Sequence, residues 1–286
     1  MPFIAVGVEN SAPIDIYYED HGSGQPVVLI HGFPYAGSTW EKQVGPLLAA
    51  GYRTITYDRR GFGNSSQPAT GYDYDTFAAD LDALLRELDL QDVILIGHSM
   101  GTGEITRYLS TYGSDRVNGA VLLSPLPPFL LKTPDNPEGL DQSVFDGFKQ
   151  QIVKDRFQYV TDFGKNFFSY DENKGKRVSE EAFHAHWTIG TRASAIGTLK
   201  CVDTWLTDFR SDLPRIDVPV LIIQGDHDMV LPISATGQRL PSMLPGSQFI
   251  TLSGAPHGIP WTHADEVNQA IMEFISAKAL VTASSR

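Results

Sequence analysis

Residues 93–101 read VILIGHSMG, an apolar run that passes directly into the pattern G-x-S-x-G. The run is typical of a strand buried on both faces, and a helix is expected from Thr102 to Tyr112. A strand, this motif and a helix in succession form a nucleophile elbow, a sharp turn that raises the serine hydroxyl above the sheet. The two glycines leave room for that turn. We therefore predict Ser99 as a nucleophile, and the alternative is a chance glycine turn between a strand and a helix.

Apolar strands alternate with helices on both sides of this stretch. Strands are expected at residues 3–8, 14–19, 27–30, 53–57, 93–96, 120–123, 218–224 and 248–252. Phe77, Leu81 and Leu85 recur at the spacing of one helix face, and a last helix is expected at residues 262–278. This alternation predicts an α/β fold with a mostly parallel eight-stranded sheet flanked by helices.

The alternation breaks between Ser124 and Asp212. This segment contains no clean buried strand, begins with several prolines and is rich in aromatic residues. We expect a helical cap at residues 125–212, inserted after the sixth strand of a core domain formed by residues 1–124 and 213–286. Such a cap would cover the carboxyl ends of the strands, where α/β folds bind ligands. Most of its aromatic side chains are expected to fill the cap, and a minority to line a pocket.

A second glycine turn follows the strand at residues 27–30, where the sequence continues His-Gly-Phe-Pro. In folds with a nucleophile elbow, the loop after this strand and the residue after the nucleophile each supply one backbone N–H to an oxyanion hole. We assign these donors to Phe33 and Met100. His31 is expected to hold the loop through backbone hydrogen bonds, and Pro34 to stiffen it.

The chain has eight histidines, and the base must be chosen among them. The expected chain order of serine, acid and histidine favours a histidine that follows the acid loop. His257 and His263 lie well past the expected acid loop. His257 follows a strand in a glycine-rich turn and is our candidate base. His263 is expected to be a solvated residue in the first turn of the last helix, and His98 to be packed on the side opposite Ser99.

The acid is sought in the loop at residues 225–232, which reads GDHDMVLP and follows the seventh strand. Asp226 and Asp228 are both candidates. We favour Asp228 because it lies deeper in the loop, and we expect Asp226 to tie the loop down.

Motifs spread over nearly the whole chain carry a resemblance to a known family. They are residues 30–34, 57–65, 97–101, 207–210 and 254–258, with further matching details at 101–104, 135–139 and 261–268. The chain resembles the α/β-hydrolase superfamily, and more narrowly its cofactor-free bacterial haloperoxidases and perhydrolases, most closely the γ-lactamase branch. The resemblance implies a Ser99, Asp228 and His257 triad, oxyanion donors at Phe33 and Met100, no metal and no haem.

The expected chemistry is acyl transfer to Ser99 followed by release to water or hydrogen peroxide. A small, neutral acyl substrate, such as an ester, lactone or γ-lactam, fits the lack of a charged anchor. The expected substrate-binding residues are Phe33, Pro34, Phe129, Trp205 and Leu231. Phe33, Phe129, Trp205 and Leu231 are expected to form apolar walls, and the carbonyl of Pro34 is a candidate acceptor for a bound nucleophile. The alternatives are a non-catalytic small-ligand receptor and a lyase on the same scaffold.

The composition excludes some classes of binding partner. The 286 residues include 22 basic and 34 acidic side chains, for a net charge of −12, which argues against nucleic acid and anionic membranes. One cysteine, Cys201, precludes an internal disulfide and is expected to be packed. No signal peptide and no apolar run of ~18 residues is found, so a cytoplasmic location is expected. A homo-oligomer is left open.

Overall fold

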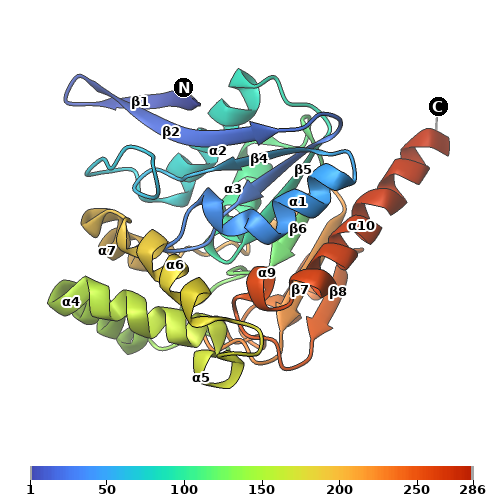
Figure 1. The fold of residues 1–286 in the computed structure, drawn as a ribbon. Helices are drawn as coiled ribbons and strands as arrows, with labels where there is room; N and C mark the ends of the chain where they lie inside the picture. The colour runs from blue at the N-terminus through green and yellow to red at the C-terminus, as the bar shows by residue number, and fades with distance from the viewer. Residues whose placement is uncertain (1, 285–286) are drawn as a thin grey trace.

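One sheet of eight strands organises the chain, and the computed structural model describes residues 2–284, with side chains up to residue 277. The strand order is β1-β2-β4-β3-β5-β6-β7-β8 (Figure 1). The strands are β1 (Phe3–Glu9), β2 (Ala12–His21), β3 (Pro26–Ile30), β4 (Arg53–Tyr57), β5 (Val93–His98), β6 (Val117–Leu123), β7 (Val220–Gly225) and β8 (Gln248–Leu252). β1 pairs with β2, and β2 with β4, in antiparallel fashion, whereas all other pairs are parallel. The predicted mostly parallel, eight-stranded sheet is confirmed.

The central strands are buried along their whole length. Every residue of β3, β5 and β7 is buried, as their continuous apolar sequences predict. β5 lies between β3 and β6 and ends at His98, so the turn that carries Ser99 emerges from the middle of the sheet.

Helices cover both faces of the sheet. α2 (Tyr74–Glu87) and α3 (Met100–Tyr112) bury Leu81, Leu84 and Ile105 against one face. On the other face, α1 (Glu41–Ala49) and α10 (Ala264–Ser284) pack around Val267 and Ile271 (Figure 1). Short helices complete the core at α8 (Leu240–Met243) and α9 (Ile259–Thr262), with 3₁₀ turns at Gly37–Trp40, Leu213–Arg215 and Gly237–Arg239.

Four helices lie between β6 and β7 in the sequence and gather at one end of the sheet (Figure 1). They are α4 (Gln142–Phe168), α5 (Tyr170–Asn173), α6 (Glu180–Thr191) and α7 (Ala195–Thr204). We refer to residues 125–212 as the cap. α4 is interrupted at Asp155, whose backbone is extended and whose carboxylate accepts the N–H of Gln158 at 3.0 Å. Asp155 therefore caps the second half of α4.

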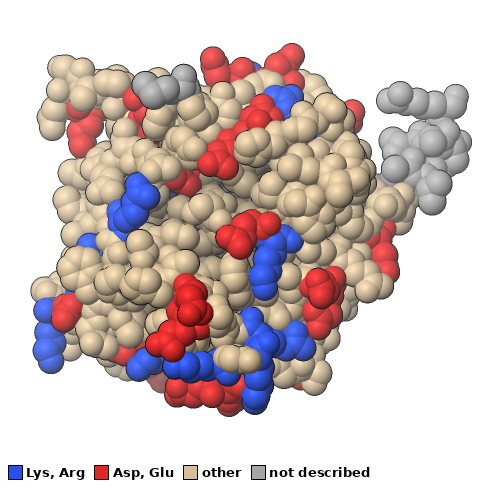
Figure 2. Space-filling model, in the orientation of Figure 1, with Lys and Arg blue, Asp and Glu red and all other residues tan. Residues whose placement is uncertain are grey.

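Charged side chains are interspersed on the face shown in Figure 2, where lysine and arginine lie beside aspartate and glutamate. Within residues 2–284, no helix combines the length and the apolarity that a bilayer crossing needs.

Candidate active site

Ser99 occupies a strained turn between β5 and α3, with φ 53° and ψ −120°. A Cβ at Gly97 would lie 2.7 Å from the carbonyl oxygen of Gly101, and one at Gly101 would lie 2.4 Å from the carbonyl oxygen of Ile30. Both approaches are closer than a side chain tolerates, so the turn requires glycine at both positions. The sequence analysis predicted a nucleophile elbow here because the two glycines leave room for the turn, and the local geometry agrees with that prediction.

Asp228 and His257 form a buried pair. The Nδ1 atom of His257 lies 2.8 Å from Oδ2 of Asp228, and neither side chain is exposed to solvent. The other carboxylate oxygen accepts the backbone N–H groups of Val230 and Leu231 at 2.9 and 2.7 Å. Because the carboxylate oxygen accepts this hydrogen bond, Nδ1 of His257 is the donor, and in the neutral imidazole Nε2 then has a free lone pair.

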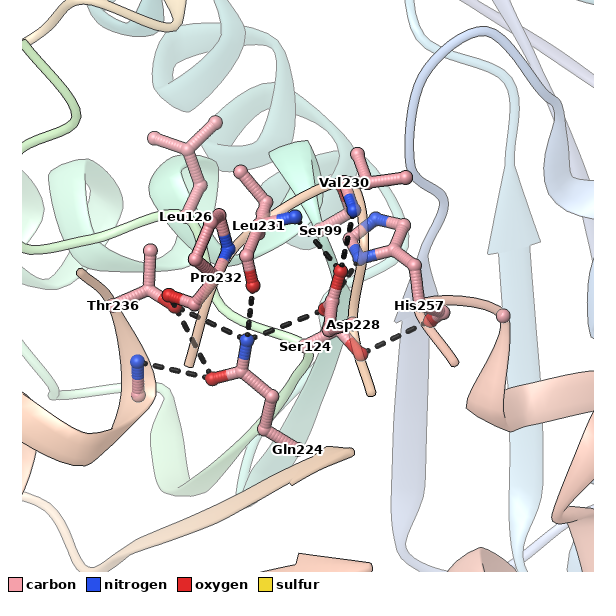
Figure 3. A network of polar contacts seen from close by, with 12 residues as sticks. Ser99, Ser124, Leu126, Gln224, Asp228, Val230, Leu231, Pro232, Thr236 and His257 are labelled. Carbon is pink, nitrogen blue, oxygen red and sulfur yellow. Dashed lines mark hydrogen bonds and ion pairs between the residues drawn. The ribbon is translucent and has the colours of Figure 1, made fainter. Parts of the chain in front are cut away.

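The Nε2 atom of His257 is buried and has no hydrogen-bond partner among the described residues. Figure 3 shows Ser99 beside the imidazole of His257, with Asp228 close to the same ring. The structure thus brings together the three side chains named from the sequence. The arrangement allows Nε2 to take a proton from the Ser99 hydroxyl once a substrate tightens the geometry.

Asp226 has a different partner. Its Oδ1 atom accepts the backbone N–H of Gly254 at 2.6 Å, which connects the loop of Asp228 to the turn that carries His257. This is the tie that we expected of Asp226.

Gln224 is a residue that the sequence analysis missed. Its buried Nε2 atom donates to the carbonyl oxygen of Leu231 at 2.8 Å and lies 3.3 Å from Oδ2 of Asp228 (Figure 3). Its Oε1 atom accepts the N–H of Gly237 at 3.0 Å. A polar residue in the apolar strand VLIIQG was the signal that could have revealed it, because buried amides need such partners.

The predicted oxyanion donors lie on two elements that meet at Ser99. Met100 is the first residue of α3, where a backbone N–H has no acceptor within the helix. Phe33 lies in the turn in which the N–H of Tyr35 donates to the carbonyl of Gly32 at 3.1 Å. Within residues 2–284, neither the Phe33 nor the Met100 N–H donates to a protein acceptor, so both are available to an oxyanion.

His31 holds the loop of Phe33, as predicted. Its Nδ1 atom donates to the carbonyl of Gly32 at 2.8 Å, and its Nε2 atom accepts the N–H of Arg59 at 3.0 Å. Burial, with Arg59 as a second cause, lowers the pKa of His31 well below its ordinary value, so the ring stays neutral. The guanidinium of Arg59 donates to the carbonyl of His31 at 3.0 Å and pairs with Glu104 of α3 at 2.7 Å.

A cavity of about 100 Å³ opens beside Ser99. Its walls include Phe33, Trp205 and Leu231 from the predicted set. The further lining residues, from the cap and the loops, are Leu126, Leu130, Leu140, Phe145, Phe148, Gln151, Tyr159, Asp162, Phe163, Asn166, Met229 and Val230. α4 thus supplies much of the lining, and sequence reasoning had not singled out its residues.

Phe129 was expected to form part of this lining and Pro34 to contact the substrate, but neither residue lines the cavity. The ring of Phe129 lies under the guanidinium of Arg210, 5.0 Å from it, rather than in the cavity. The ring of Pro34 packs close to Gly190 of α6.

Two histidine expectations also need correction. His98 is buried, as expected, but its ring lies 4.9 Å from that of His257 instead of on the opposite side. His263 is buried rather than solvated. It directly follows α9, and its Nδ1 atom is 2.9 Å from Oγ1 of Thr262. Cys201 is packed inside α7, as expected, where burial raises the pKa of its thiol to about 12. Within the described residues, no group of three or more His, Cys, Asp or Glu side chains is placed to hold a metal ion.

Comparisons with known proteins agree with this geometry. The family described as "alpha/beta hydrolase fold" matches residues 25–264. A Synechocystis protein provisionally named a non-haem chloroperoxidase is 62% identical over 275 residues, which are 96% of this chain and 100% of that protein. An esterase/perhydrolase of Acinetobacter calcoaceticus, described as bifunctional, is 36% identical over 92% of this chain and 96% of its own length.

A solved structure gives the same result in three dimensions. The bromoperoxidase of Bacillus anthracis superposes with a TM-score of 0.92 at 47% sequence identity, over 96% of this chain and 99% of that one. The sheet order, the elbow at Ser99 and these matches lead to one conclusion. The chain belongs to the alpha/beta hydrolase fold family.

Proposed function

We propose that the protein is a serine hydrolase that acts through an acyl-enzyme on small neutral acyl substrates. The observation that carries the proposal is the buried Asp228–His257 pair behind a serine on a nucleophile elbow. His257 takes the proton of Ser99 as the hydroxyl oxygen attacks a carbonyl carbon, and Asp228 stabilises the imidazolium that forms. The amides of Phe33 and Met100 bind the oxyanion, and collapse of the intermediate releases the alcohol or amine with the proton from His257.

The cavity supports the choice of substrate. Its walls are mainly aromatic and aliphatic, which favours an apolar acyl group over a charged one. Its volume of about 100 Å³ is below the ~150 Å³ of a protein cavity that holds benzene, so a small acyl group suits it. Esters, lactones and strained γ-lactams all present such a group.

The second half-reaction distinguishes hydrolysis from perhydrolysis. Water attacking the acyl-enzyme gives a carboxylic acid, whereas hydrogen peroxide gives a peracid, which then oxidises halide to hypohalous acid and returns the carboxylic acid. The names of the relatives, which include non-haem chloroperoxidase and esterase/perhydrolase, support a role for peroxide here.

The nucleophile is tested with a fluorophosphonate probe and intact-mass spectrometry. We expect one adduct per chain on the wild type and none on Ser99→Ala. Turnover of p-nitrophenyl acetate should fall about 10⁴-fold or more in Ser99→Ala, because no acyl-enzyme can form. An unlabelled wild-type chain would favour a non-catalytic ligand receptor on this scaffold.

The acceptor is tested by measuring ester consumption and peracid formation with and without hydrogen peroxide, alongside a γ-lactam panel. Perhydrolysis predicts that peroxide diverts acyl groups from acid to peracid. If acid remains the sole product at millimolar peroxide, the perhydrolase assignment is wrong and the hydrolase assignment stands.

A further inference from the structure

The backbone carbonyl of His257 accepts two buried hydrogen bonds. Nε2 of His98 and Oγ of Ser124 each lie 3.0 Å from this oxygen. Both donors are buried, with exposed fractions of 4% and 0%. Because a carbonyl oxygen only accepts, the Nε2 atom of His98 must carry a proton, which fixes the tautomer of the ring.

These two bonds connect the turn of His257 to the nucleophile. His98 is the residue directly before Ser99, and Ser124 directly follows β6, the neighbouring strand. His257 lies 159 residues after His98 in the sequence. The donors therefore join the predicted base to the same strand ends that support the predicted nucleophile.

The cap holds the other side of the turn. The N–H of Gly258 donates to the carbonyl of Phe167 at 2.7 Å, and the ring of Phe167 meets the rings of His98 and His257 edge-on at 5.5 and 5.4 Å. The main chain is thus held at the His257 carbonyl and at the following amide. Movement of the imidazole is limited to rotation of its own side chain, which Asp228 restrains at Nδ1.

No hydrogen bond between Ser99 and Nε2 of His257 restrains this geometry, since Nε2 has no partner among the described residues. We propose that His98 is a positioning residue, whose Nε2–H holds the His257 carbonyl and so fixes the distance between the imidazole and the Ser99 hydroxyl. The inference rests on the proposed function and extends it to a residue outside the triad and the oxyanion hole.

The charge state of His98 suits this task. Burial, with His257 as the next cause, lowers the pKa of His98 to about 3. His98 therefore stays neutral while His257 becomes an imidazolium during catalysis. It supplies an N–H donor 4.9 Å, ring to ring, from the base without adding a like charge that would oppose proton transfer.

The test compares two amides at this position. The amide nitrogen of glutamine reaches about as far as Nε2 of histidine, whereas that of asparagine ends near the place of Nδ1 and cannot reach the His257 carbonyl. We expect His98→Asn to lower kcat about 10- to 100-fold at nearly unchanged KM, because small misplacements of a catalytic group have effects of this size. His98→Gln should stay within about threefold of the wild type by the same argument. Melting curves of both variants monitor folding.

Ser124→Ala provides a second test, since His98 and Ser124 both donate to the carbonyl oxygen of His257. Alone it should have a small effect, and combined with the His98 change it should lower kcat by more than the product of the single effects. If His98→Asn melts below the assay temperature, the double variant His98→Gln/Ser124→Ala is used in its place. In that variant the glutamine amide alone must hold the His257 carbonyl, so its kcat tests the same hydrogen bond.

The outcomes separate the two proposals. Fluorophosphonate labelling of the wild type with wild-type kcat in a folded His98→Asn overturns the positioning role alone. Equal losses of kcat in the Asn and Gln variants overturn it as well, because ring packing rather than the N–H would then matter. Absence of labelling in the wild type overturns the proposed function, and the positioning role with it.

Discussion

Asp226 and Asp228 lie two residues apart in one loop, yet their carboxylates have different partners. Asp228 faces Nδ1 of His257, whereas Asp226 accepts the backbone N–H of Gly254. At the scale of single residues, this pair offers a matched test of the predicted acid.

Asp228→Asn should lower kcat about 10⁴-fold, because an amide stabilises the wrong imidazole tautomer and cannot stabilise the imidazolium. Asp226→Asn removes a neighbouring charge of the same kind without touching His257, and kcat should stay within about tenfold of the wild type. Steady-state turnover of p-nitrophenyl acetate measures both. Similar losses in the two variants would contradict the choice of Asp228.

The triad candidates were predictable because each carries a local signal. Ser99 lies in a motif, His257 in a glycine turn after a strand, and Asp228 in the loop after another strand. His98 contacts the carbonyl of His257, which lies 159 residues further along the chain, so no neighbouring pattern marks this contact. Gln224 contacts its own loop, and only its polarity within the apolar strand β7 marks it. Whether an aromatic residue such as Phe129 or Phe145 lines the cavity depends on how the cap packs, which local sequence does not encode.

At the scale of elements, a buried ion pair ties three segments together. Arg59 follows β4, Glu104 lies on α3, and the guanidinium also donates to the carbonyl of His31 in the oxyanion loop. Tyr57 of β4 donates to the other oxygen of Glu104. Neither Arg59 nor Glu104 is exposed to solvent, so each charge depends on the other.

Glu104→Gln should lower the free energy of unfolding by about 3–5 kcal/mol, because it leaves the guanidinium of Arg59 buried without a counter-charge. Asp82→Asn breaks the Arg86–Asp82 pair on the surface of α2, and its effect should be below about 0.5 kcal/mol. Urea denaturation compares the two. Equal effects would show that burial of the pair is unimportant.

The contact between α4 and the turn after His257 can be tested by substituting the glycine that allows it. A Cβ at Gly258 would lie 2.5 Å from Cε1 of Phe167. Gly258→Ala should lower the free energy of unfolding by about 1–3 kcal/mol, as overpacking does, and should reduce kcat. Gly147 also lies in α4, and a Cβ there would meet no atom within 4 Å apart from its chain neighbours and the backbone of the helix itself. Gly147→Ala should therefore raise stability by up to ~1 kcal/mol.

The sheet was predictable to within a few residues, because apolar strands buried on both faces have a strong signal. The cap helices were expected only as a group. Asp155 divides α4 by capping its second half, and the sequence pattern does not distinguish such an internal cap from a surface aspartate. α10 begins after the expected start because Pro260 lies in the separate turn α9.

At the scale of the whole molecule, buried histidines make stability depend on pH. Burial lowers the pKa of His98 to about 3 and of His186 to about 4. In the unfolded chain both titrate near ~6.5, so below that pH the unfolded state binds more protons than the folded state. Their contribution to stability is therefore complete above about pH 6.5 and is lost as the pH falls towards the folded values.

Each such histidine should steepen the fall of the unfolding free energy by up to ~1.4 kcal/mol per pH unit below pH 6.5. His186→Gln should make the decline between pH 6.5 and 5 shallower, although the variant starts less stable because the ring is packed. His184→Gln, at an exposed position of the same helix α6, should leave the slope unchanged. Denaturant unfolding at a series of pH values measures the slope. If the unfolding free energy of His186→Gln falls with pH as steeply as that of the wild type, burial of this ring does not control the pH dependence.

The pairing of β6 with β7 has a consequence for biosynthesis. These strands are neighbours in the sheet, yet the cap is translated between them, and His257 follows β8, the last strand. A ribosome must therefore synthesise the chain beyond residue 257 before Ser99 and His257 can come together. Premature termination anywhere in the cap yields a fragment that contains Ser99 and lacks His257, so such a fragment is expected to lack the proposed activity.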